Sequence, residues 1–275
     1  MKMLKFQYFL VTKRKYNMRN VFIKIIKFLA VPVFFSLLSF LVFYGQYIES
    51  SHVKVESLNS TAKVSKFYPS NQKKSTAKSR DSSVRVLSFD FDNGMVSTSS
   101  ATYMIYQGEY YILTTNHGLI GGCDTIQIEA EGELYDCIEI IKTDILNDYA
   151  IIKIQEVVHR NPIKVPKELK TTRHDWKKTL TLLNKVVYTG YPNSIGPLTI
   201  DGTIMGFDPK GLIYVQSYAW SGSSGSGVFD RDGKLLGYIL AIDVGSSEYG
   251  STILENVMIV VPIYKVDWSV IFERG

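Results

Sequence analysis

The sequence lacks the motifs that mark a metal or nucleotide site. Its 275 residues include only four histidines and two cysteines, and neither His-Glu-x-x-His nor a pair of Cys-x-x-Cys motifs occurs, although these spacings bring zinc ligands together. It has no glycine-rich loop that ends in Lys-Ser or Lys-Thr, the pattern that cradles phosphates. His52, His159 and His174 are scattered through polar segments. We therefore expect no metal ion and no cofactor.

Excess positive charge is absent from most of the chain, although the net charge is +5. Residues 1–27 carry eight Lys or Arg and no acid, and residues 46–84 carry seven bases against three acids. Residues 85–275 retain 16 bases and 23 acids. A surface that binds nucleic acid needs concentrated positive charge. This balance argues against nucleic acid as the partner of the folded part.

One long apolar run, FLAVPVFFSLLSFLVFY at residues 28–44, contains no charge and is long enough to cross a bilayer. The basic residues 1–27 before it favour a cytoplasmic N-terminus. We expect a transmembrane signal anchor at 28–45 that leaves the rest of the chain on the exported side, periplasmic or extracellular. A cleaved signal peptide is the alternative, and it would make the protein secreted. Translation from Met18 would give a more ordinary signal-peptide start.

Sustained apolar periodicity is missing from residues 46–82, which are rich in Ser, Lys, Asn and Thr. This composition predicts a flexible linker. Residues 83–275 form the expected folded domain, in which short β-rich runs are separated by turns. The runs fall into two series of about six, at about 84–155 and 183–268. This pattern predicts an all-β fold with two six-stranded antiparallel barrels.

The regions between and after the two series have a different character. A polar interval covers residues 156–180, with no predicted strand. The last segment, PIYKVDWSVIFE, starts with Pro262, and proline is favoured in the first turn of a helix. We therefore predict a short C-terminal helix.

The two cysteines, Cys123 and Cys137, flank a predicted hairpin whose turn falls near Glu131 and Gly132. Pairing across that turn would bring them into the same neighbourhood without placing them directly opposite one another. An exported domain permits a disulfide, but the sequence leaves open whether one forms. Neither cysteine resembles a nucleophile.

Three short segments carry the candidate chemistry. YILTTNHGLI places His117 at the end of an apolar strand, and DILNDYAIIKI places Asp148 before another. In AWSGSSGSGVFD, small residues precede a strand. Gly222 and Gly225 would allow a tight turn that presents a hydroxyl beside convergent amides, whereas a flexible surface loop is the alternative. Acyl transfer at a serine needs a hydroxyl, a base, an orienting acid and amide donors.

Taken in order, the segments SATYMIYQGEYYILTTNHGLI, LNDYAIIKI, VVYTGYPNSIG and SGSSGSGVFDRDGKLLGYILAI resemble the signature segments of trypsin-like serine proteases with the chymotrypsin fold. The resemblance is greatest to the bacterial exported branch and covers roughly residues 85–268. It implies that His117 is the general base, Asp148 the orienting acid and Ser224 the nucleophile. It also implies that the backbone amides of Gly222 and Ser224 form the oxyanion hole.

Two of these assignments have rivals within the sequence. Asp144 is the second candidate for the acid, but Asp148 fits the family's Asp-x-Ala-apolar pattern better. Ser223 and Ser226 flank the nucleophile, yet only Ser224 lies in the Gly-x-Ser-Gly frame.

The sequence also departs from the family. Ser226 and Gly227 stand where relatives usually have Gly-Pro or Gly-Gly after the nucleophile's glycine. Bacterial relatives often carry a peptide-binding domain after the protease. Because this chain ends at Gly275, we expect no such domain.

The resemblance implies a pocket for a substrate side chain, lined by Tyr218, Ala219, Ile239, Leu240 and Ala241. No acid occupies these positions, which weakens a preference for Lys or Arg and favours a small or medium apolar side chain. The expected function is that of a membrane-tethered serine endopeptidase that cleaves protein or peptide substrates through an acyl-enzyme. The alternative is a catalytically silent, protease-like binding or scaffolding module at the membrane.

Overall fold

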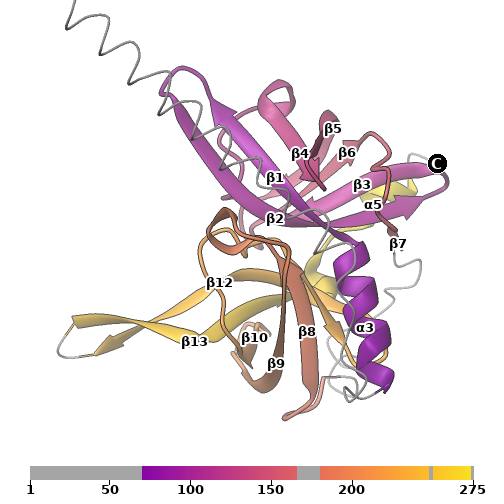
Figure 1. Cartoon of the computed structure of the whole chain (residues 1–275). Coiled ribbons are helices and arrows are strands. Elements are labelled where there is room, and N and C mark those ends of the chain that lie inside the picture. Colours follow the sequence, from indigo (N-terminus) through magenta and orange to yellow (C-terminus); the bar gives the residue numbers. More distant parts are fainter. Residues whose placement is uncertain (1–69, 166–179, 248–249, 274–275) are drawn as a thin grey trace, which may run out of the picture. The chain divides into compact units, whose positions relative to one another are not determined.

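The computed structural model describes residues 70–165, 180–247 and 250–273 (Figure 1). The predicted basic N-terminus, the membrane anchor at 28–45 and the first part of the linker lie outside these residues. Within the described ranges, no helix has the length and apolar character needed to cross a bilayer.

The first barrel contains six antiparallel strands. They are β1 (Ser83–Asp90), β2 (Met95–Tyr106), β3 (Glu109–Thr114), β4 (Ile126–Ala130), β5 (Glu133–Asp144) and β6 (Tyr149–Ile154). They pair in the order β1-β4-β5-β6-β3-β2, and β2 pairs back to β1, which closes the sheet. Alternate residues of β4 face the core, so that Ile126, Ile128 and Ala130 are buried, as period-two alternation requires.

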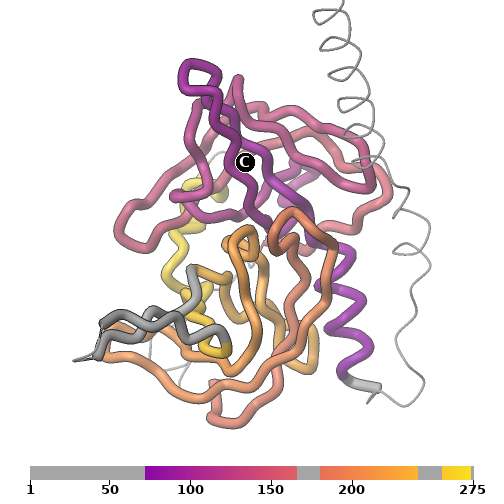
Figure 2. Tube along the Cα trace, turned by 60° about the vertical axis from the view of Figure 1, so that its left-hand side comes forward, coloured from indigo at the N-terminus to yellow at the C-terminus, as the bar shows by residue number. Residues whose placement is uncertain are grey.

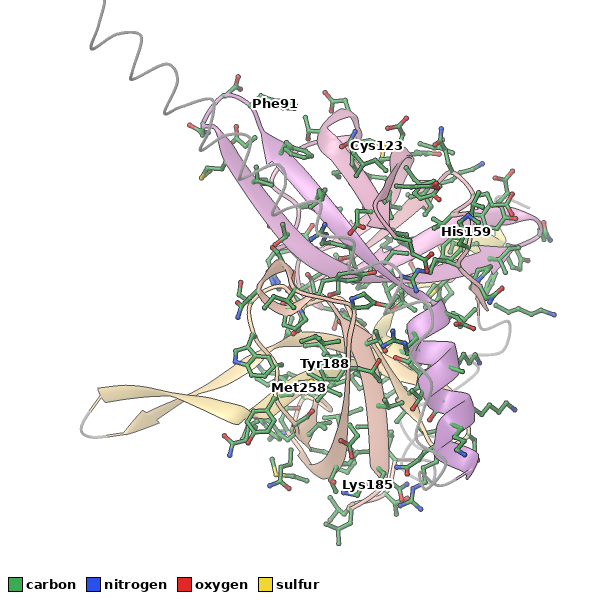
Figure 3. All side chains as sticks on the ribbon, viewed as in Figure 1. Phe91, Cys123, His159, Lys185, Tyr188 and Met258 are labelled. Carbon is green, nitrogen blue, oxygen red and sulfur yellow. A yellow bond between two sulfur atoms is a disulfide. The ribbon has the colours of Figure 1, made fainter. Side chains whose placement is uncertain are left out.

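The second barrel also contains six strands. They are β8 (Lys185–Gly190), β9 (Leu198–Phe207), β10 (Ile213–Gln216), β11 (Gly227–Asp230), β12 (Leu235–Ser247) and β13 (Gly250–Pro262). They close in the order β10-β13-β12-β11-β8-β9. Tyr188 and Met258, both fully buried, lie inside this barrel (Figure 3). The prediction of two six-stranded antiparallel barrels is confirmed.

A short strand and a helix were not predicted from the sequence. The two-residue strand β7 (Ile163–Lys164) lies in the polar interval and pairs in parallel with β2. The helix α3 (Ser70–Asp81) lies in the predicted flexible linker and packs on β8, β9 and β11 of the second barrel (Figures 1 and 2). The linker prediction is therefore wrong for residues 70–81.

Helix α3 docks through hydroxyl groups, which explains why no apolar period revealed it. The residues buried on its inner side and just after it are Ser75, Thr76, Ser79 and Ser82. The Ser79 hydroxyl donates to Thr189 Oγ1 at 3.0 Å. Lys78 Nζ donates to the carbonyl of Gly233 at 2.7 Å. These bonds replace the apolar contacts by which most surface helices are recognised in a sequence.

The C-terminal helix begins later than predicted. Pro262 is the last residue of β13 and has an extended backbone, with φ −62° and ψ 141°. A 3₁₀ turn follows at Ile263–Lys265, and the one-turn helix α5 covers Ser269–Phe272. Asp267 separates these turns, and its Oδ1 accepts the backbone N–H of Ser269 at 3.2 Å. Pro262 thus ends a strand and does not open the helix.

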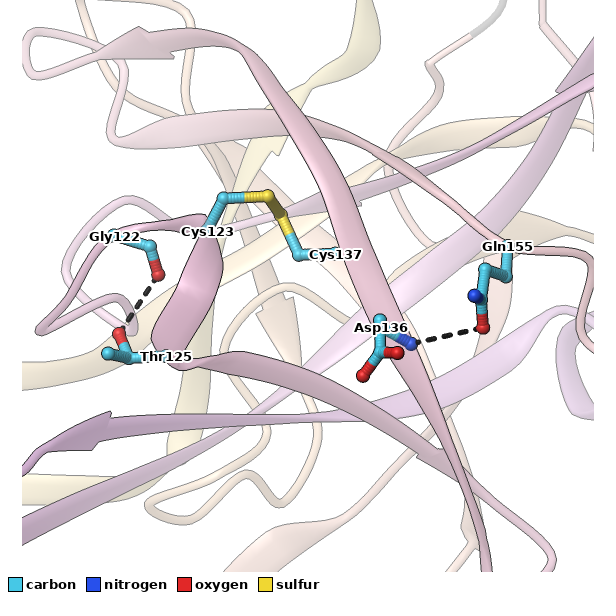
Figure 4. Close-up of a disulfide and its surroundings, with 6 residues drawn as sticks. All are labelled: Gly122, Cys123, Thr125, Asp136, Cys137 and Gln155. Atoms are coloured by element: carbon cyan, nitrogen blue, oxygen red, sulfur yellow. Dashed lines mark hydrogen bonds between the residues drawn. A yellow bond between two sulfur atoms is a disulfide. The ribbon is translucent and has the colours of Figure 1, made fainter.

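The structure joins Cys123 and Cys137 in a disulfide, with their Cα atoms 5.3 Å apart (Figure 4). The hairpin turn between β4 and β5 falls at Glu131 and Gly132, which have φ +53° and +85°. Cys123 lies in the short 3₁₀ turn η1 (Cys123–Thr125) that precedes β4, so the two cysteines are neighbours without being cross-strand partners. The disulfide connects the segment after His117 to strand β5.

Candidate active site

His117 and Asp148 come together because β3 and β6 are antiparallel neighbours, with Thr114 opposite Ala150. His117 follows the end of β3, and Asp148 immediately precedes β6. Asp148 Oδ1 accepts the backbone N–H of His117 at 2.8 Å. The ring Nδ1 of His117 donates to Oδ2 of the same carboxylate. One carboxylate therefore fixes both the backbone and the imidazole ring of His117.

Asp144, the second candidate for the acid, has a different role in the structure. Its Oδ1 accepts the backbone N–H of Asn147 at 2.9 Å, and its Oδ2 accepts the side-chain amide of the same residue at 3.3 Å. These bonds, led by the backbone bond, hold the pKa of Asp144 below its ordinary value. Asp144 shapes the turn between β5 and β6, while Asp148 contacts the histidine.

Tyr238 of the second barrel supports this turn through a hydrogen bond, although sequence reasoning did not single it out. Its hydroxyl donates to the carbonyl of Asn147 at 2.5 Å. Burial raises the pKa of Tyr238, and the negative charge of Asp148 raises it further, so the hydroxyl keeps the proton that it donates. A buried tyrosine usually has a partner for its hydroxyl, but the sequence does not say which one.

The turn that carries Ser224 depends on two glycines with left-handed backbones, Gly222 at φ +91° and Gly225 at φ +88°. A Cβ atom on Gly225 would lie 2.1 Å from the carbonyl oxygen of Ser100. A Cβ atom on Gly222 would lie 2.6 Å from the carbonyl oxygen of Tyr191. Both distances are far below van der Waals contact, so only glycine fits at either position.

Most backbone amides of this turn, which comprises residues 220–226 and is called the Ser224 turn below, are already hydrogen-bonded. The N–H of Ser223 donates to Trp220 O at 2.9 Å, and the N–H of Gly225 donates to Ile239 O at 2.8 Å. The amides of Gly222 and Ser224 have no hydrogen-bond partner among the described residues. These two donors are therefore available to a bound molecule.

The carbonyls that precede these two amides are held from the opposite side. Asn193 N–H donates to the carbonyl of Ser221 at 2.6 Å, and Ser226 N–H donates to the carbonyl of Ser223 at 3.1 Å. In a trans peptide the N–H and C=O point in opposite directions. Fixing the carbonyls therefore also fixes the directions of the Gly222 and Ser224 amides.

A cleft of about 300 Å³ contains both His117 and Ser224 in its lining. Its walls come from both barrels and comprise Ser97, Thr98, Ser99, His117, Gly118, Ala219, Trp220, Ser221, Gly222, Ser224, Ile239 and Leu240. The Ser224 hydroxyl donates to the carbonyl of Leu240 at 3.1 Å. Among the described residues, no hydrogen bond connects this hydroxyl to His117.

The pocket predicted from the sequence coincides with this cleft only in part. Ala219, Ile239 and Leu240 line it, whereas Tyr218 is not among its lining residues. The side chain of Ala241 lies outside what the structure describes. Trp220, which was not predicted, lines the cleft and stacks on Tyr218 with 5.8 Å between ring centroids.

The chain is similar to known proteins both in its sequence family and in its structure. A family profile described as the trypsin-like peptidase domain matches residues 94–237. No curated protein sequence matches the chain. The serine endoprotease from Yersinia pestis is similar in structure, with a TM-score of 0.55 at 19% identity over 75% of this chain and 68% of that one.

A second solved structure, the HtrA-type protease AlgWS227A with a tripeptide, has a TM-score of 0.54 at 18% identity. The match covers 69% of this chain and 58% of that protein, so this chain spans less than two thirds of that relative. At these identities the structural likeness establishes the fold. The family profile spans more than half of the sequence, which confirms the resemblance: this chain belongs to the trypsin-like peptidase family and is a serine endopeptidase.

Proposed function

We propose that this protein is a membrane-tethered serine endopeptidase that cleaves peptide bonds through Ser224, His117 and Asp148. The observation that supports this reading most directly is the shared cleft, which is lined by Ser224 and by His117, whose imidazole is bonded to the Asp148 carboxylate. Two unpaired amides, those of Gly222 and Ser224, belong to residues of the same cleft. The arrangement contains each component that acyl transfer needs.

The reaction begins with a rotation of the Ser224 side chain away from Leu240 O, where its hydroxyl is bonded in this structure. Catalytic hydrogen bonds are often loose in the absence of substrate and tighten when it binds. Asp148 holds the Nδ1 side of His117, which leaves Nε2 to accept the proton as Ser224 Oγ attacks the peptide carbonyl.

The carbonyl oxygen becomes negatively charged in the tetrahedral intermediate and accepts hydrogen bonds from the Gly222 and Ser224 amides. His117 then passes its proton to the leaving amine as the C–N bond breaks, which gives an acyl-enzyme. Water attacks the acyl carbon while His117 takes its proton. The same imidazole returns that proton to Ser224 Oγ as the new C-terminal carboxylate departs.

The walls of the cleft favour a substrate with a small or medium apolar side chain. Ala219, Trp220, Ile239 and Leu240 provide apolar surface, and the lining residues that the structure describes include no Asp or Glu. A buried Lys or Arg side chain would have no carboxylate to pair with there, and an unpaired buried charge is costly. We expect cleavage after residues such as alanine or valine.

Membrane tethering rests on the sequence of residues 28–45 and the positive charges before it. An anchor of this orientation would hold the peptidase domain on the exported side of the membrane. Its substrates would then be proteins or peptides in that compartment.

A second candidate function is a catalytically silent binding or scaffolding module at the membrane. The bond from Ser224 Oγ to Leu240 O favours it, because this hydroxyl is engaged away from His117. The two candidates differ in a measurable way: only the enzyme hydrolyses peptides, and only the enzyme loses this activity when the hydroxyl is removed.

The experiment measures cleavage of a fluorogenic peptide library by the full chain in detergent micelles or vesicles. Ser224→Ala should lower the turnover number by about 10⁴-fold or more. Ser226→Ala is the matched control, since it removes a fully buried hydroxyl two residues away that has no partner among the described residues. It should keep turnover within about twofold. Turnover that survives Ser224→Ala, or a parent protein without any, would refute the proposal.

A further inference from the structure

We propose that Ser100 is a positioning residue that holds the turn around Ser224, and through this turn the Gly222 and Ser224 amides, in the conformation needed for catalysis. The inference rests on the proposed function, because these amides matter only if they bind an oxyanion. Ser100 lies in β2 of the first barrel and is fully buried. It is 122 residues away from Gly222 in the sequence, so neither motif nor spacing points to it.

Ser100 contacts the turn on both sides of the proposed nucleophile. Its hydroxyl donates to the carbonyl of Gly222 at 2.7 Å. Its backbone N–H donates to the carbonyl of Ser224 at 2.9 Å. A single residue of the first barrel therefore holds two carbonyls of a turn that belongs to the second barrel.

The same hydroxyl also accepts a hydrogen bond from the backbone N–H of Tyr191 at 2.9 Å. Tyr191 precedes the 3₁₀ turn η2 (Pro192–Ser194), in which Asn193 has a left-handed backbone with φ +50° and ψ 34°. Asn193 donates the 2.6 Å bond to the carbonyl of Ser221. Ser100 thus acts on Gly222 directly and on the preceding peptide through the Tyr191–Asn193 segment.

The surroundings of Ser100 leave little room for another arrangement. A Cβ atom on Gly190 would lie 2.9 Å from Ser100 Oγ, and one on Gly225 would lie 2.1 Å from its carbonyl oxygen. Thr114 Oγ1 donates to that carbonyl oxygen at 2.8 Å. The backbone N–H, the carbonyl and the hydroxyl of Ser100 are therefore all hydrogen-bonded at the point where three chain segments meet.

Removing the hydroxyl would leave two buried backbone groups, Tyr191 N–H and Gly222 C=O, without this partner. Unpaired buried polar groups are costly, so the turn would move to find new ones. Displacement of a catalytic group by about 1 Å costs on the order of 100-fold in rate. The effect should fall on the turnover number, because the amides bind the oxygen only once it carries negative charge.

The test compares Ser100→Ala with the parent full chain on one peptide substrate. The turnover number should fall by roughly 10- to 100-fold, while KM changes by no more than about twofold. Binding of a peptide aldehyde, which forms a hemiacetal with its oxygen in the oxyanion hole, should weaken by a similar factor. A merely structural role would not couple the loss of turnover to the loss of aldehyde binding.

Ser83→Ala is the matched control. Ser83 is another buried serine of the first barrel whose hydroxyl donates to a carbonyl of the second barrel, Thr189 O at 2.9 Å, and not to any residue of the Ser224 turn. It should leave the turnover number within about threefold of the parent. An equal loss in Ser83→Ala and Ser100→Ala would overturn the proposal, because the effect would then belong to any bond between the barrels.

If Ser100→Ala does not fold, Ser100→Cys replaces it, since a thiol fills the position of the hydroxyl and donates only weakly. Its turnover number should be about tenfold below that of the parent, again with KM unchanged. A parent-like turnover number in whichever variant folds would overturn the proposal. If instead the parent is inactive, or Ser224→Ala stays active, the proposed function itself has failed, so the two failures are distinguishable.

Discussion

The two barrels fix their halves of the proposed active site by different means. In the first barrel, the Asp148 carboxylate contacts His117 twice, once at the backbone and once at the ring. In the second barrel, the Ser224 turn is held mostly by bonds between backbone groups and by two glycines with left-handed backbones, together with the Ser100 hydroxyl from the first barrel. We infer that replacing the Asp148 carboxylate should disorder the first half, whereas adding a side chain at a left-handed glycine should disorder the second half.

The largest effect should come from Asp148→Asn. Asparagine also tolerates the left-handed backbone of Asp148, φ +52°, so the fold should persist. The loss of the charge and the altered tautomer of His117 should lower the turnover number by about 10⁴-fold, measured as steady-state peptide hydrolysis. Asp144→Asn is the control, because its remaining oxygen can still accept from Asn147. Similar losses in both variants would contradict the assignment of the acid.

Gly225→Ala tests the second half through the backbone. Its Cβ atom would lie 2.1 Å from Ser100 O, at φ +88°. The left-handed strain and the overpacking together should reduce the free energy of unfolding by about 2–5 kcal/mol, measured by urea denaturation, with loss of activity. Gly206→Ala has no atom within 4 Å of the new Cβ and should cost less than about 0.5 kcal/mol. Comparable costs at the two glycines would show that the turn is not constrained as described.

Removing the disulfide tests how much of the first half depends on a covalent connection. Replacing both Cys123 and Cys137 by serine opens a link with a sequence separation of 14. The free energy of unfolding should fall by about 3 kcal/mol, measured by urea denaturation. The turnover number of the folded protein should stay near that of the parent, because Asp148 still holds His117. A turnover number that fell with the disulfide would show that the covalent link, and not the carboxylate, positions the imidazole.

The smallest effect concerns the ion pair between Lys142 and Asp267, 2.8 Å apart, which ties β5 to the C-terminal segment. Asp267 accepts side-chain hydrogen bonds from Lys142 and Ser269. These two bonds, of which the Lys142 bond has the larger effect, hold the pKa of Asp267 below its ordinary value. A lowered carboxyl pKa contributes stability above about pH 4, and this contribution is lost as pH falls through the folded-state pKa.

Lys142→Met should therefore lower the thermal midpoint slightly at pH 7, because exposed ion pairs contribute little. The difference from the parent should shrink as the pH falls through the folded-state pKa of Asp267, because the carboxyl is then protonated in both states. A difference that stayed constant over this range would mean that packing of the lysine stem, and not the ion pair, is responsible.

Much of the fold was predictable, because apolar alternation and turn residues are local signals. For example, β6 (Tyr149–Ile154) and β9 (Leu198–Phe207) fall within the two predicted series of strands, at about 84–155 and 183–268. The helix α3 was missed, since its buried face consists of serine and threonine. The first half of β2, which begins at Met95, carries no such local signal either, because its buried serines Ser99 and Ser100 resemble a loop in sequence.

The active-site residues could be predicted only where their side chains occur in an order along the sequence that matches a known family. His117, Asp148 and Ser224 stand in such an order. Ser100 and Tyr238 contribute bonds to backbone carbonyls more than 90 residues away in the chain. Such contacts depend on how the barrels pack together, which no short segment of sequence specifies.

The central claim is that His117 activates Ser224. Its most direct test is mass spectrometry of the full chain after reaction with a fluorophosphonate, combined with the labelling rate of His117→Ala. We expect a single adduct on Ser224 and a labelling rate at least about 100-fold lower without the imidazole. An adduct on another residue, no adduct at all, or an equal rate in His117→Ala would contradict it.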